Sequence, residues 1–270
     1  MSPPSIAPAA RNARQLVLPE VGPAGQARLA AARVLVVGCG GLGAPVISSL
    51  AAAGVGHLTL IDDDTVEPSN LNRQVLFTEA DLGRSKVVVA AERARALGGA
   101  IDVATRAERL AVGSARGAVR GFSLVVDCAD GLPTKFLLND ACVREDVPLV
   151  HGSATAWSGQ VLVVPGRRGP CLRCLFEGPL PQGALPTCRT AGILGAVTGV
   201  VGSFQAAEAV KLLVANPNTL VGRLLAVDVL TPSVRAVAFP RRVDCAACGD
   251  SPTVDGTNAA DYDAAACDDQ

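Results

Sequence analysis

The sequence of 270 residues predicts an α/β protein with a Rossmann-like, mainly parallel sheet that antiparallel strands extend. Over the first 150 residues, short β-branched runs alternate with helical patterns, which is typical of a parallel sheet covered on both faces. Beyond Pro148 the apolar runs continue with shorter connections, so some of the later strands are expected to be antiparallel. The sheet is therefore expected to continue rather than to start again in a second domain.

The predicted elements follow from these runs. The parallel strands are expected at Arg33–Gly38, His57–Asp62, Ile101–Ala107 and Leu124–Asp127. The later strands are expected at Leu149–Ser153, Gln160–Val164, Leu224–Val229 and Val234–Phe239. Helices are expected after Gly43, over Lys86–Leu97 and, as a long buried helix, over Gly192–Leu213.

One domain is expected over residues 1–248. It would begin with a helical arm over residues 1–32 and include a Pro- and Gly-rich mobile crossover loop over residues 176–190. Residues 249–270 hold six Asp, no Lys or Arg and little apolar mass. Such a composition predicts an acidic, disordered tail.

Composition excludes some classes of partner. The formal net charge of −1 gives no basic field that would attract nucleic acid or an anionic membrane nonspecifically. The first 20 residues lack the apolar core of a signal peptide, and the run Ala191–Gly202 is too short and Gly-rich to span a bilayer. We therefore expect a cytoplasmic protein with neither a nucleic-acid nor a membrane partner.

A glycine-rich turn predicts a phosphate site. Gly38, Gly40, Gly41 and Gly43 form the pattern G-x-G-x-x-G between a predicted strand and a predicted helix. Without side chains there, phosphates can approach backbone N–H groups at the positive end of the helix. Asp62 ends the second strand, where it can bind ribose hydroxyls of NAD or of ATP. The turn alone favours an NAD-dependent oxidoreductase.

The residues that follow favour cleavage of a triphosphate instead. Asp62-Asp-Asp64 precedes Ser69-Asn-Leu-Asn-Arg73-Gln74 and Gly83-x-x-Lys86, and hydride transfer explains none of these. Fixed Arg and Lys donors and a metal ion would stabilise the charge that develops as pyrophosphate leaves. Asp130 ends the fourth strand, where it could hold Mg²⁺. The alternatives are that Asp130 caps the next helix and that Arg73 and Lys86 are solvated.

Taken together, these motifs resemble the adenylation domain of the ThiF/MoeB/HesA family of E1-like sulfur-carrier adenylyltransferases, from near residue 11 to residue 248. The resemblance implies that Asp62 binds the ribose of ATP, that Asn70, Arg73 and Lys86 bind its phosphates, and that Asp130 serves magnesium. Asn72 stands where the family often has His, so its place in the site is weak. The expected nucleotide-binding set comprises Gly38, Gly40, Gly41, Gly43, Asp62, Asp64, Asn70, Asn72, Arg73, Gln74, Lys86, Asp130 and Arg14.

The amino-terminal arm implies a dimer. Arg11-Asn-Ala-Arg14-Gln15 resembles the family's Arg-x-x-Arg-Gln element, although Asn12 stands where the family often has Tyr. In the family the second Arg reaches the γ-phosphate in the neighbouring subunit's site. The resemblance therefore implies a homodimer, whereas Arg14 by itself would be a surface arginine.

Two cysteine pairs predict a zinc site. Cys171-x-x-Cys174 and Cys245-x-x-Cys248 can supply the four thiolates that tetrahedral structural zinc prefers. Because the pairs are far apart in sequence, the metal would clip the carboxyl-terminal region onto the middle of the chain. The alternative for either pair alone is C-x-x-C redox chemistry.

Cys188 is the candidate nucleophile. It precedes the long helix and neighbours Arg189, so its thiolate should be favoured. The surrounding Thr-Cys-Arg-Thr-Ala-Gly segment is closest to ThiF, but family members differ in whether this Cys reacts covalently. The expected catalytic set is thus Arg73, Lys86, Asp130 and Cys188. His57 and His151 have no metal-ligand spacing and are expected to be structural.

The predicted reaction is ATP-dependent adenylation of the C-terminal glycine carboxylate of a ubiquitin-like sulfur-carrier protein ending in Gly-Gly, with release of pyrophosphate. A cysteine desulfurase or a rhodanese is the implied sulfur donor. The Cys188 segment and the lack of a rhodanese-sized domain favour a ThiS-like carrier in thiamine thiazole synthesis over a MoeB-like role in molybdopterin synthesis. The alternatives of other classes are an NAD-dependent oxidoreductase and a noncatalytic, zinc-stabilised dimer that binds nucleotide.

Overall fold

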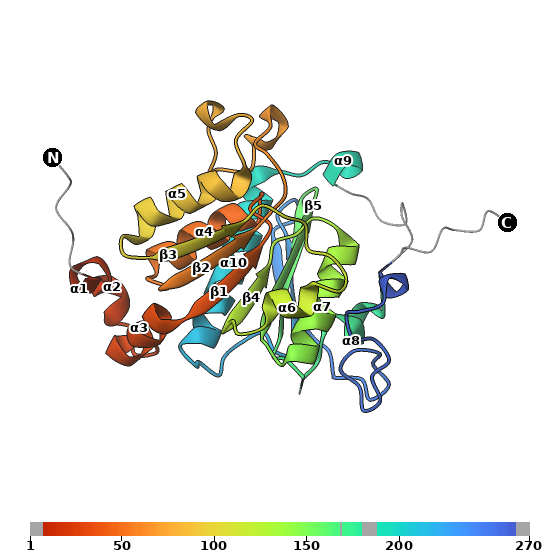
Figure 1. The fold of residues 1–270 in the computed structure, drawn as a ribbon. Helices are drawn as coiled ribbons and strands as arrows, with labels where there is room; N and C mark the ends of the chain where they lie inside the picture. The colour runs from red at the N-terminus through yellow and green to blue at the C-terminus, as the bar shows by residue number, and fades with distance from the viewer. Residues whose placement is uncertain (1–7, 168, 180–187, 263–270) are drawn as a thin grey trace.

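The computed structural model describes residues 8–167, 169–179 and 188–262, and in these the strands form one sheet in the order β3-β2-β1-β4-β5-β6-β7-β8 (Figure 1). The first five in this order run parallel and the last three are antiparallel. The strands are β1 (Arg33–Val37), β2 (His57–Ile61), β3 (Asp102–Arg106), β4 (Leu124–Asp127), β5 (Leu149–Thr155), β6 (Ser158–Val164), β7 (Arg223–Asp228) and β8 (Ser233–Ala238). The predicted fold class is confirmed.

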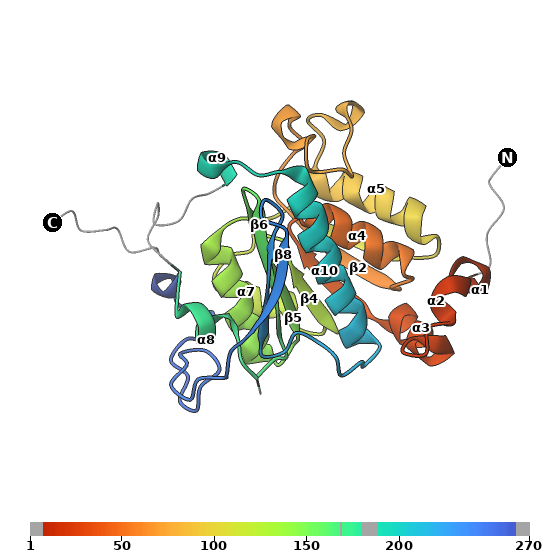
Figure 2. The same ribbon diagram turned by 180° about the vertical axis from the view of Figure 1, so that it is seen from behind.

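Helices cover both faces of the parallel part of the sheet. Figure 2 shows α4 (Gly43–Ala52), α5 (Lys86–Gly98) and α10 (Gly195–Leu213) on one face. The opposite face carries α6 (Ala115–Val119), α7 (Leu132–Glu145) and α8 (Leu172–Phe176) in Figure 1. The remaining helices are α1 (Pro8–Arg11), α2 (Ala13–Leu16) and α3 (Gly22–Ala31) in the amino-terminal arm, α9 (Cys188–Ala191), and the short 3₁₀ turns η1 (Pro68–Asn70), η2 (Glu79–Asp81) and η3 (Ala259–Asp261).

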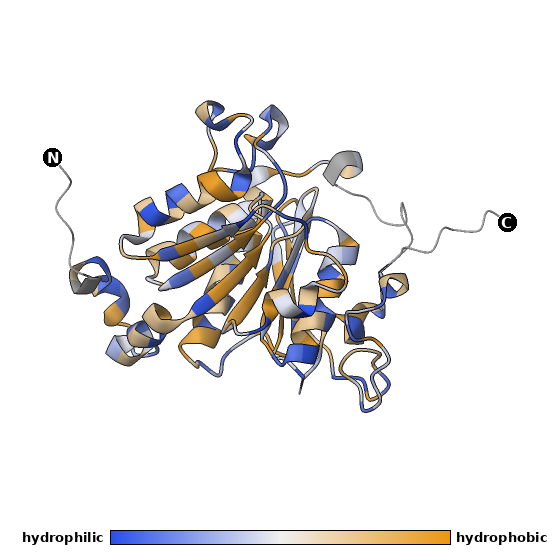
Figure 3. Cartoon of the chain, viewed as in Figure 1, coloured by the Kyte–Doolittle hydropathy of each residue, from blue (hydrophilic) through white to orange (hydrophobic). Residues whose placement is uncertain are grey.

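Alternating side chains of the strands build two cores. On β1, Val34 and Val36 pack under α4 and α10, whereas Leu35 and Val37 pack under α7. Figure 3 shows the hydrophobic colour concentrated in the central strands. Burying one Leu side chain completely stabilises the fold by about 1.5–3 kcal/mol relative to leaving it exposed. The two cores therefore hold the helices against the two faces of the sheet.

The strand order reverses beside β1, which is where open α/β sheets form a ligand-binding crevice. This strand pairs in parallel with β2 on one side and β4 on the other, so Val37 lies beside both Ile61 and Asp127. The turns that follow β1, β2 and β4 therefore leave the sheet at the same edge. Open α/β sheets bind their ligands at such a reversal of strand order.

The helix α10 begins three residues later than the sequence predicts. Gly192 adopts a positive φ of 75°, and Ile193 forms a β-bridge with Ala156, so the chain at this point is extended. Leu194 is the N-cap, also in an extended conformation, and the helix follows from Gly195.

None of the helices in the described ranges is both long and apolar enough to cross a membrane.

The carboxyl-terminal segment corrects the sequence prediction. We expected disorder over residues 249–270, but residues 249–262 pack against the domain and Tyr262 is only 4% exposed. Its hydroxyl donates to Asp140 Oδ2 at 2.7 Å, and the same carboxylate accepts a bidentate pair from Arg173. This buried aromatic side chain anchors the segment together with the ion pair between Arg116 and Asp255, and composition reveals neither contact. Residues 263–270 of the predicted tail and 180–187 of the predicted crossover loop lie outside the described residues.

Replacing Tyr262 by Phe should lower the free energy of unfolding by about 1.5–3 kcal/mol, the usual range for a hydrogen bond to a charged group. The ring would still pack, so the change isolates the hydroxyl that Asp140 accepts. Urea denaturation of the variant and the parent protein measures the difference. Equal stabilities would show that the contact contributes nothing to the fold.

Candidate active site

The glycine turn joins β1 to α4 through two close backbone approaches. A Cβ on Gly38, whose φ is 96°, would overlap the carbonyl oxygen of Cys128 in the turn after β4. A Cβ on Gly43 would overlap the carbonyl oxygen of Gly38. Only glycine allows both approaches, and within the described chain the N–H groups of Gly40, Gly41 and Leu42 before α4 remain open to a phosphate.

Two side chains pack against the middle of this turn. A Cβ on Gly40 would lie 3.3 Å from Gln74 Nε2, and one on Gly41 would lie 3.0 Å from Thr198 Cγ2 on α10. Gln74 is buried, and its Oε1 accepts no hydrogen bond from the residues that the structure describes. The structure thus brings Gln74 to the turn, as the sequence predicts, and adds Thr198, which lies more than 150 residues away and carries no local signal of its role.

Asp62 ties the turn to the end of β2. Its Oδ2 accepts a hydrogen bond from the backbone N–H of Cys39 at 2.7 Å, and its Oδ1 accepts one from the N–H of Asp64 at 2.9 Å. Burial raises the pKa of Asp62, while these two backbone donors oppose the rise. Each carboxylate oxygen has a second lone pair, so the side chain can still accept from a ribose hydroxyl.

Lys86 is a buried cation at the start of α5. It is 5% exposed, and its Nζ donates to Asp64 Oδ2 at 2.7 Å. Through Asp64 and Asp62, hydrogen bonds connect this ammonium group to Cys39 in the glycine turn. The alternative that Lys86 is a solvated surface charge is wrong for this structure, because burying a lysine is costly unless it is paired.

The loop 68–74 carries the other predicted phosphate ligands. Asn70 is buried, and its Oδ1 accepts from the N–H of Glu67 at 3.2 Å, so this oxygen stabilises the loop. Arg73 is half-buried, and its guanidinium donates to Ser69 O at 2.8 Å and to Asn72 Oδ1 at 3.0 Å. The loop also packs on α10, since a Cβ on Gly195 would overlap the backbone of Asn72.

Asp130 lies in the turn between β4 and α7, and it is exposed. The helix has Gly131 at its N-cap with no side-chain cap, and the Asp130 carboxylate makes no hydrogen bond to any residue that the structure describes. Asp130 therefore does not cap α7, which was the alternative to a magnesium role that the sequence left open. A carboxylate without partners at the ligand-binding edge of the sheet is available to a cation.

One predicted residue, Arg14, is not brought to the turn, and the side chain of another, Cys188, lies outside the described part of the chain. Arg14 is an exposed residue of α2, and its neighbour Gln15 donates to Ala53 O at the far end of α4, about 15 Å of helix from the glycine turn. Arg14 of the same subunit therefore lies at the opposite end of α4. Cys188 begins α9, but its side chain is not among those described.

A buried charged cluster beneath the crevice has no place in the predicted site. Asp127 Oδ2 accepts from His151 Nδ1 at 2.7 Å, and Lys135 Nζ lies 3.4 Å from both carboxylate oxygens. Although burial raises it, the pKa of Asp127 lies below its usual value because Lys135 and His151 stabilise the carboxylate. Gln205 of α10 donates to Asp127 O at 2.7 Å, so four elements meet here. The sequence signal was the scarcity of lysine, since Lys135 is one of three.

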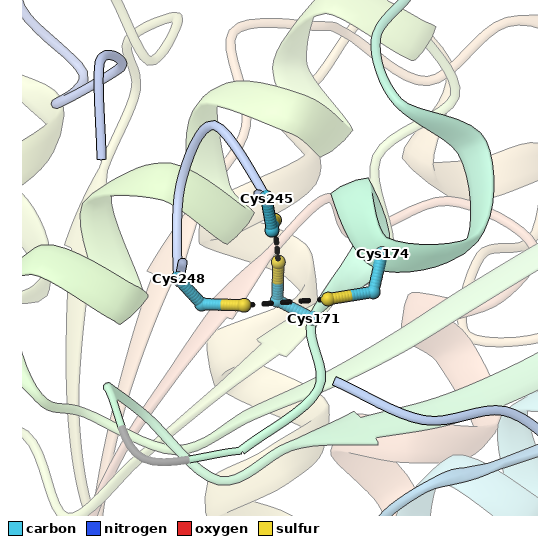
Figure 4. Close-up of side chains that lie close together, drawn as sticks. All are labelled: Cys171, Cys174, Cys245 and Cys248. Carbon is cyan, nitrogen blue, oxygen red and sulfur yellow. Dashed lines mark hydrogen bonds between the residues drawn. The ribbon is translucent and has the colours of Figure 1, made fainter. Parts of the chain in front are cut away.

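The four predicted metal ligands do converge, as Figure 4 shows. Cys171 Sγ lies 3.6 Å from Cys245 Sγ, and Cys174 Sγ lies 3.3 Å from Cys248 Sγ. All four sulfur atoms lie within 4.8 Å of one another and are buried. A tetrahedral zinc ion with Zn–S bonds of about 2.3 Å requires sulfur atoms about 3.8 Å apart, so the cluster fits zinc.

The surroundings of the cysteine cluster supply cations and backbone donors. The N–H of Arg242 donates to Cys174 Sγ at 3.4 Å, and Arg241 Nε donates to Cys248 O at 2.9 Å. Donors of this kind offset the negative charge of a four-thiolate site and orient its ligands. Arg173, inside the first knuckle, instead holds the carboxyl-terminal segment through Asp140.

The chain belongs to the ThiF family, whose model matches residues 12–247. The adenylyltransferase and sulfurtransferase MOCS3 of Bos taurus is 49% identical over 254 residues, which cover 94% of this chain and 55% of that protein. The chain thus spans about half the length of these relatives. The sulfur carrier protein adenylyltransferase of Thermus thermophilus is 46% identical over 248 residues and matches at nearly full length, covering 90% of this chain and 92% of that protein.

Solved structures show the same fold. Escherichia coli MccB with succinimide superposes with a TM-score of 0.79 at 22% identity, covering 92% of this chain and 75% of that chain. MccB with ATP gives a TM-score of 0.74 at 24% identity over 84% of this chain and 69% of that chain. At these identities the likeness concerns the fold alone.

Gly38→Ala should abolish nucleotide binding and lower stability, because its Cβ would overlap Cys128 O. Gly121→Ala is the matched control: its φ of 81° also disfavours a side chain, but no atom lies within 4 Å of the new Cβ. We expect the control to lose about 1 kcal/mol of stability from its backbone conformation and to bind ATP normally. Thermal unfolding with and without ATP and Mg²⁺ separates the two effects, and equal ATP responses would contradict the assignment of the turn.

Proposed function

We propose that the protein uses ATP to adenylate the C-terminal glycine carboxylate of a small ubiquitin-like sulfur-carrier protein, with release of pyrophosphate. The observation that carries this proposal is the buried ammonium group of Lys86, which hydrogen bonds connect to the glycine turn. A fixed cation beside a phosphate-binding turn has a direct role in phosphoryl chemistry and none in hydride transfer. The names of the relatives from Bos taurus and Thermus thermophilus support the same activity.

Each residue at the crevice would have a separate role in binding the nucleotide. The N–H groups of the glycine turn would hold phosphate oxygens, and Asp62 would accept from the ribose. Lys86 would exchange its bond to Asp64 for the triphosphate, and Arg73 would add a second cation, so the charge on the departing pyrophosphate is stabilised. Asp130, which has no partner among the described residues, would hold a magnesium ion, which would supply further neutralisation of the phosphates.

The attacking group needs no general base. The carrier's carboxylate is already ionised near neutral pH, since the usual pKa of a C-terminal carboxyl is about 3.3–3.7. It attacks the α-phosphorus, the bond to the bridging oxygen of pyrophosphate breaks, and an acyl-adenylate remains. Catalysis therefore depends on positioning and charge stabilisation.

Arg14 would act from a second subunit. It lies at the end of α4 away from the glycine turn, so it cannot serve the site of its own chain without moving that helix end. A homodimer in which Arg14 reaches the partner's triphosphate removes this difficulty.

The four-cysteine cluster would hold a structural zinc ion that fastens residues 245–248 to α8, independently of the nucleotide.

The identity of the carrier is a finer proposal. The Cys188 segment favours a ThiS-like carrier, with a MoaD-like carrier as the second candidate, and Cys188 would take part in sulfur delivery from a cysteine desulfurase or a rhodanese. Incubation with ATP, Mg²⁺ and each carrier in turn, followed by intact mass spectrometry of the carrier, distinguishes them. The true carrier gains the mass of AMP.

Lys86→Ala should reduce carrier-dependent exchange of labelled pyrophosphate into ATP by about 100-fold or more, the usual effect of removing one electrostatic donor. Lys211→Ala is the control, because this lysine lies on α10 and pairs with Glu208 and Asn218. An NAD-dependent oxidoreductase would give no exchange in the parent protein. Equal exchange in the Lys86 and Lys211 variants would remove the central argument.

Cys171→Ser should lower the zinc content from one ion per chain to none. It should also release the carboxyl-terminal segment from the rest of the domain. Cys142→Ala is the control, since Cys142 is buried in α7 and outside the cluster. Elemental analysis gives the zinc content, and limited proteolysis reports release of the segment. Full zinc content in the Cys171 variant would refute a four-cysteine site.

A further inference from the structure

One face of α10 contacts several parts of the proposed nucleotide site. Four residues at spacings of three or four form this face: Gly195, Thr198, Gly202 and Gln205. Thr198 packs on Gly41 of the glycine turn, and a Cβ on Gly202 would overlap Leu42 O at the start of α4, which lies beside α10 in Figure 2. Gln205 Nε2 donates to Asp127 O at 2.7 Å, at the end of β4. The helix thus supports the glycine turn and the end of β4 together.

The first residue of α10 is the one that touches the loop 68–74. A Cβ on Gly195 would overlap Asn72 O and would lie 3.2 Å from Arg73 Cα. Both are main-chain atoms, which cannot rotate away as the end of a side chain can. Gly195 does not have a positive φ, so its backbone conformation would admit any residue. The contact with the loop is therefore what requires glycine at this position.

The start of α10 is held in place by the hairpin between β5 and β6. The N–H of Leu194 donates to Ala156 O at 3.1 Å, and the N–H of Ala156 donates to Gly192 O at 2.9 Å. Further along the helix, the contacts with the glycine turn, α4 and β4 oppose any displacement. Asn72, by contrast, is exposed and Arg73 is half-buried. A side chain on residue 195 would therefore displace the loop and not the helix.

Arg73 has hydrogen-bond donors left for a ligand. Its Nη1 makes both of its bonds, to Ser69 O and to Asn72 Oδ1. Its Nε and Nη2 make none to the residues that the structure describes. A guanidinium carries five N–H donors, and those of Nε and Nη2 are suited to bidentate binding of a phosphate. The next residue, Gln74, packs on Gly40, so these donors belong to a loop that borders the glycine turn.

We propose that Gly195 is a positioning residue for Arg73. Without a side chain at residue 195, α10 packs directly on the main chain of Asn72 and Arg73, and this contact sets where the guanidinium meets the triphosphate. The inference rests on the proposed function, in which Arg73 binds the phosphates. Because α10 supports both the loop and the glycine turn, their donors are fixed relative to one another before ATP arrives, as electrostatic catalysis requires.

Gly195→Ala should raise the Kd for ATP in the presence of Mg²⁺ about tenfold, because the new Cβ moves Arg73 away from the outer phosphates. The Kd for AMP, which lacks these phosphates, should stay unchanged. Isothermal titration calorimetry measures both constants. Gly199→Ala is the matched control: it lies on the same helix without a positive φ, and no atom lies within 4 Å of its new Cβ, so it should bind both nucleotides as the parent protein does.

The variant is expected to fold, because one extra methyl group costs less than the stability of a domain and Ala is the better helix former. Urea denaturation checks this. Carrier-dependent exchange of pyrophosphate should fall about 10- to 100-fold, since a misplacement of about 1 Å is enough for such a loss. Loss of the native fold, or an equal loss of ATP and AMP affinity, would overturn the inference, because Gly195 would then support the domain as a whole.

A double-mutant cycle tests the link to Arg73. Arg73→Ala should raise the Kd for ATP about 10- to 100-fold, and adding Gly195→Ala should change it by less than about twofold, because both substitutions act through the same guanidinium. Additive losses, parent-like ATP affinity in the Gly195→Ala variant, or an Arg73→Ala variant that binds ATP normally would each overturn the inference. A parent protein that binds ATP but shows no carrier-dependent exchange would instead refute the proposed function.

Discussion

The close approach of two backbones at the crevice is the constraint on which the rest of the site depends. Gly38 lies so near the carbonyl of Cys128 that no side chain fits between them. This contact joins the turn after β1 to the turn after β4, and the parallel register of β1 with β2 brings Asp62 to the same edge. The glycine turn, Asp62 and Asp130 are therefore positioned by one packing arrangement of main chain.

Charge is placed around this edge in pairs. Lys86 is held by Asp64, and Lys135 is held by Asp127, which also accepts from His151, so each of these two buried cations has a carboxylate before any ligand arrives. Buried charges persist only with such partners. The two pairs differ in exposure, because Asp64 is largely exposed whereas Asp127 is fully buried. The ion pair of Lys86 is thus open to solvent on its carboxylate side, whereas that of Lys135 is enclosed on both sides.

A second centre stabilises the half of the molecule that lies away from the nucleotide. The four cysteines join α8 to the loop around residues 245–248, and Arg173 between two of them binds Asp140 of α7. Tyr262 then packs over the same ion pair. Phe136 and Leu172 belong to the same hydrophobic cluster as the four cysteines and Tyr262, so the cysteine cluster and the carboxyl-terminal segment share one support.

The sequence by itself determined the positions of the strands and their mainly parallel arrangement in the first half, the glycine turn and the two cysteine pairs. It could do so because each is a local pattern: a 3.6 or 2 residue period, a turn that only glycine permits, a two-residue spacing between thiols. It also named Asp62, Gln74 and Lys86, which the structure brings to one edge. The sequence did not show that the side-chain oxygen of Asn70 accepts from the backbone of Glu67 and so stabilises its own loop.

Only the tertiary structure decided which distant residues meet. Thr198 reaches Gly41, Gln205 reaches Asp127, and Tyr262 reaches Asp140 over separations that carry no periodicity in sequence. His151 has the same character: its position on β5 predicts a packed residue, and only the pairing of β4 with β5 places it against Asp127. Burial and hydrogen-bond partners belong to the packed chain, because they depend on all the elements that surround a residue.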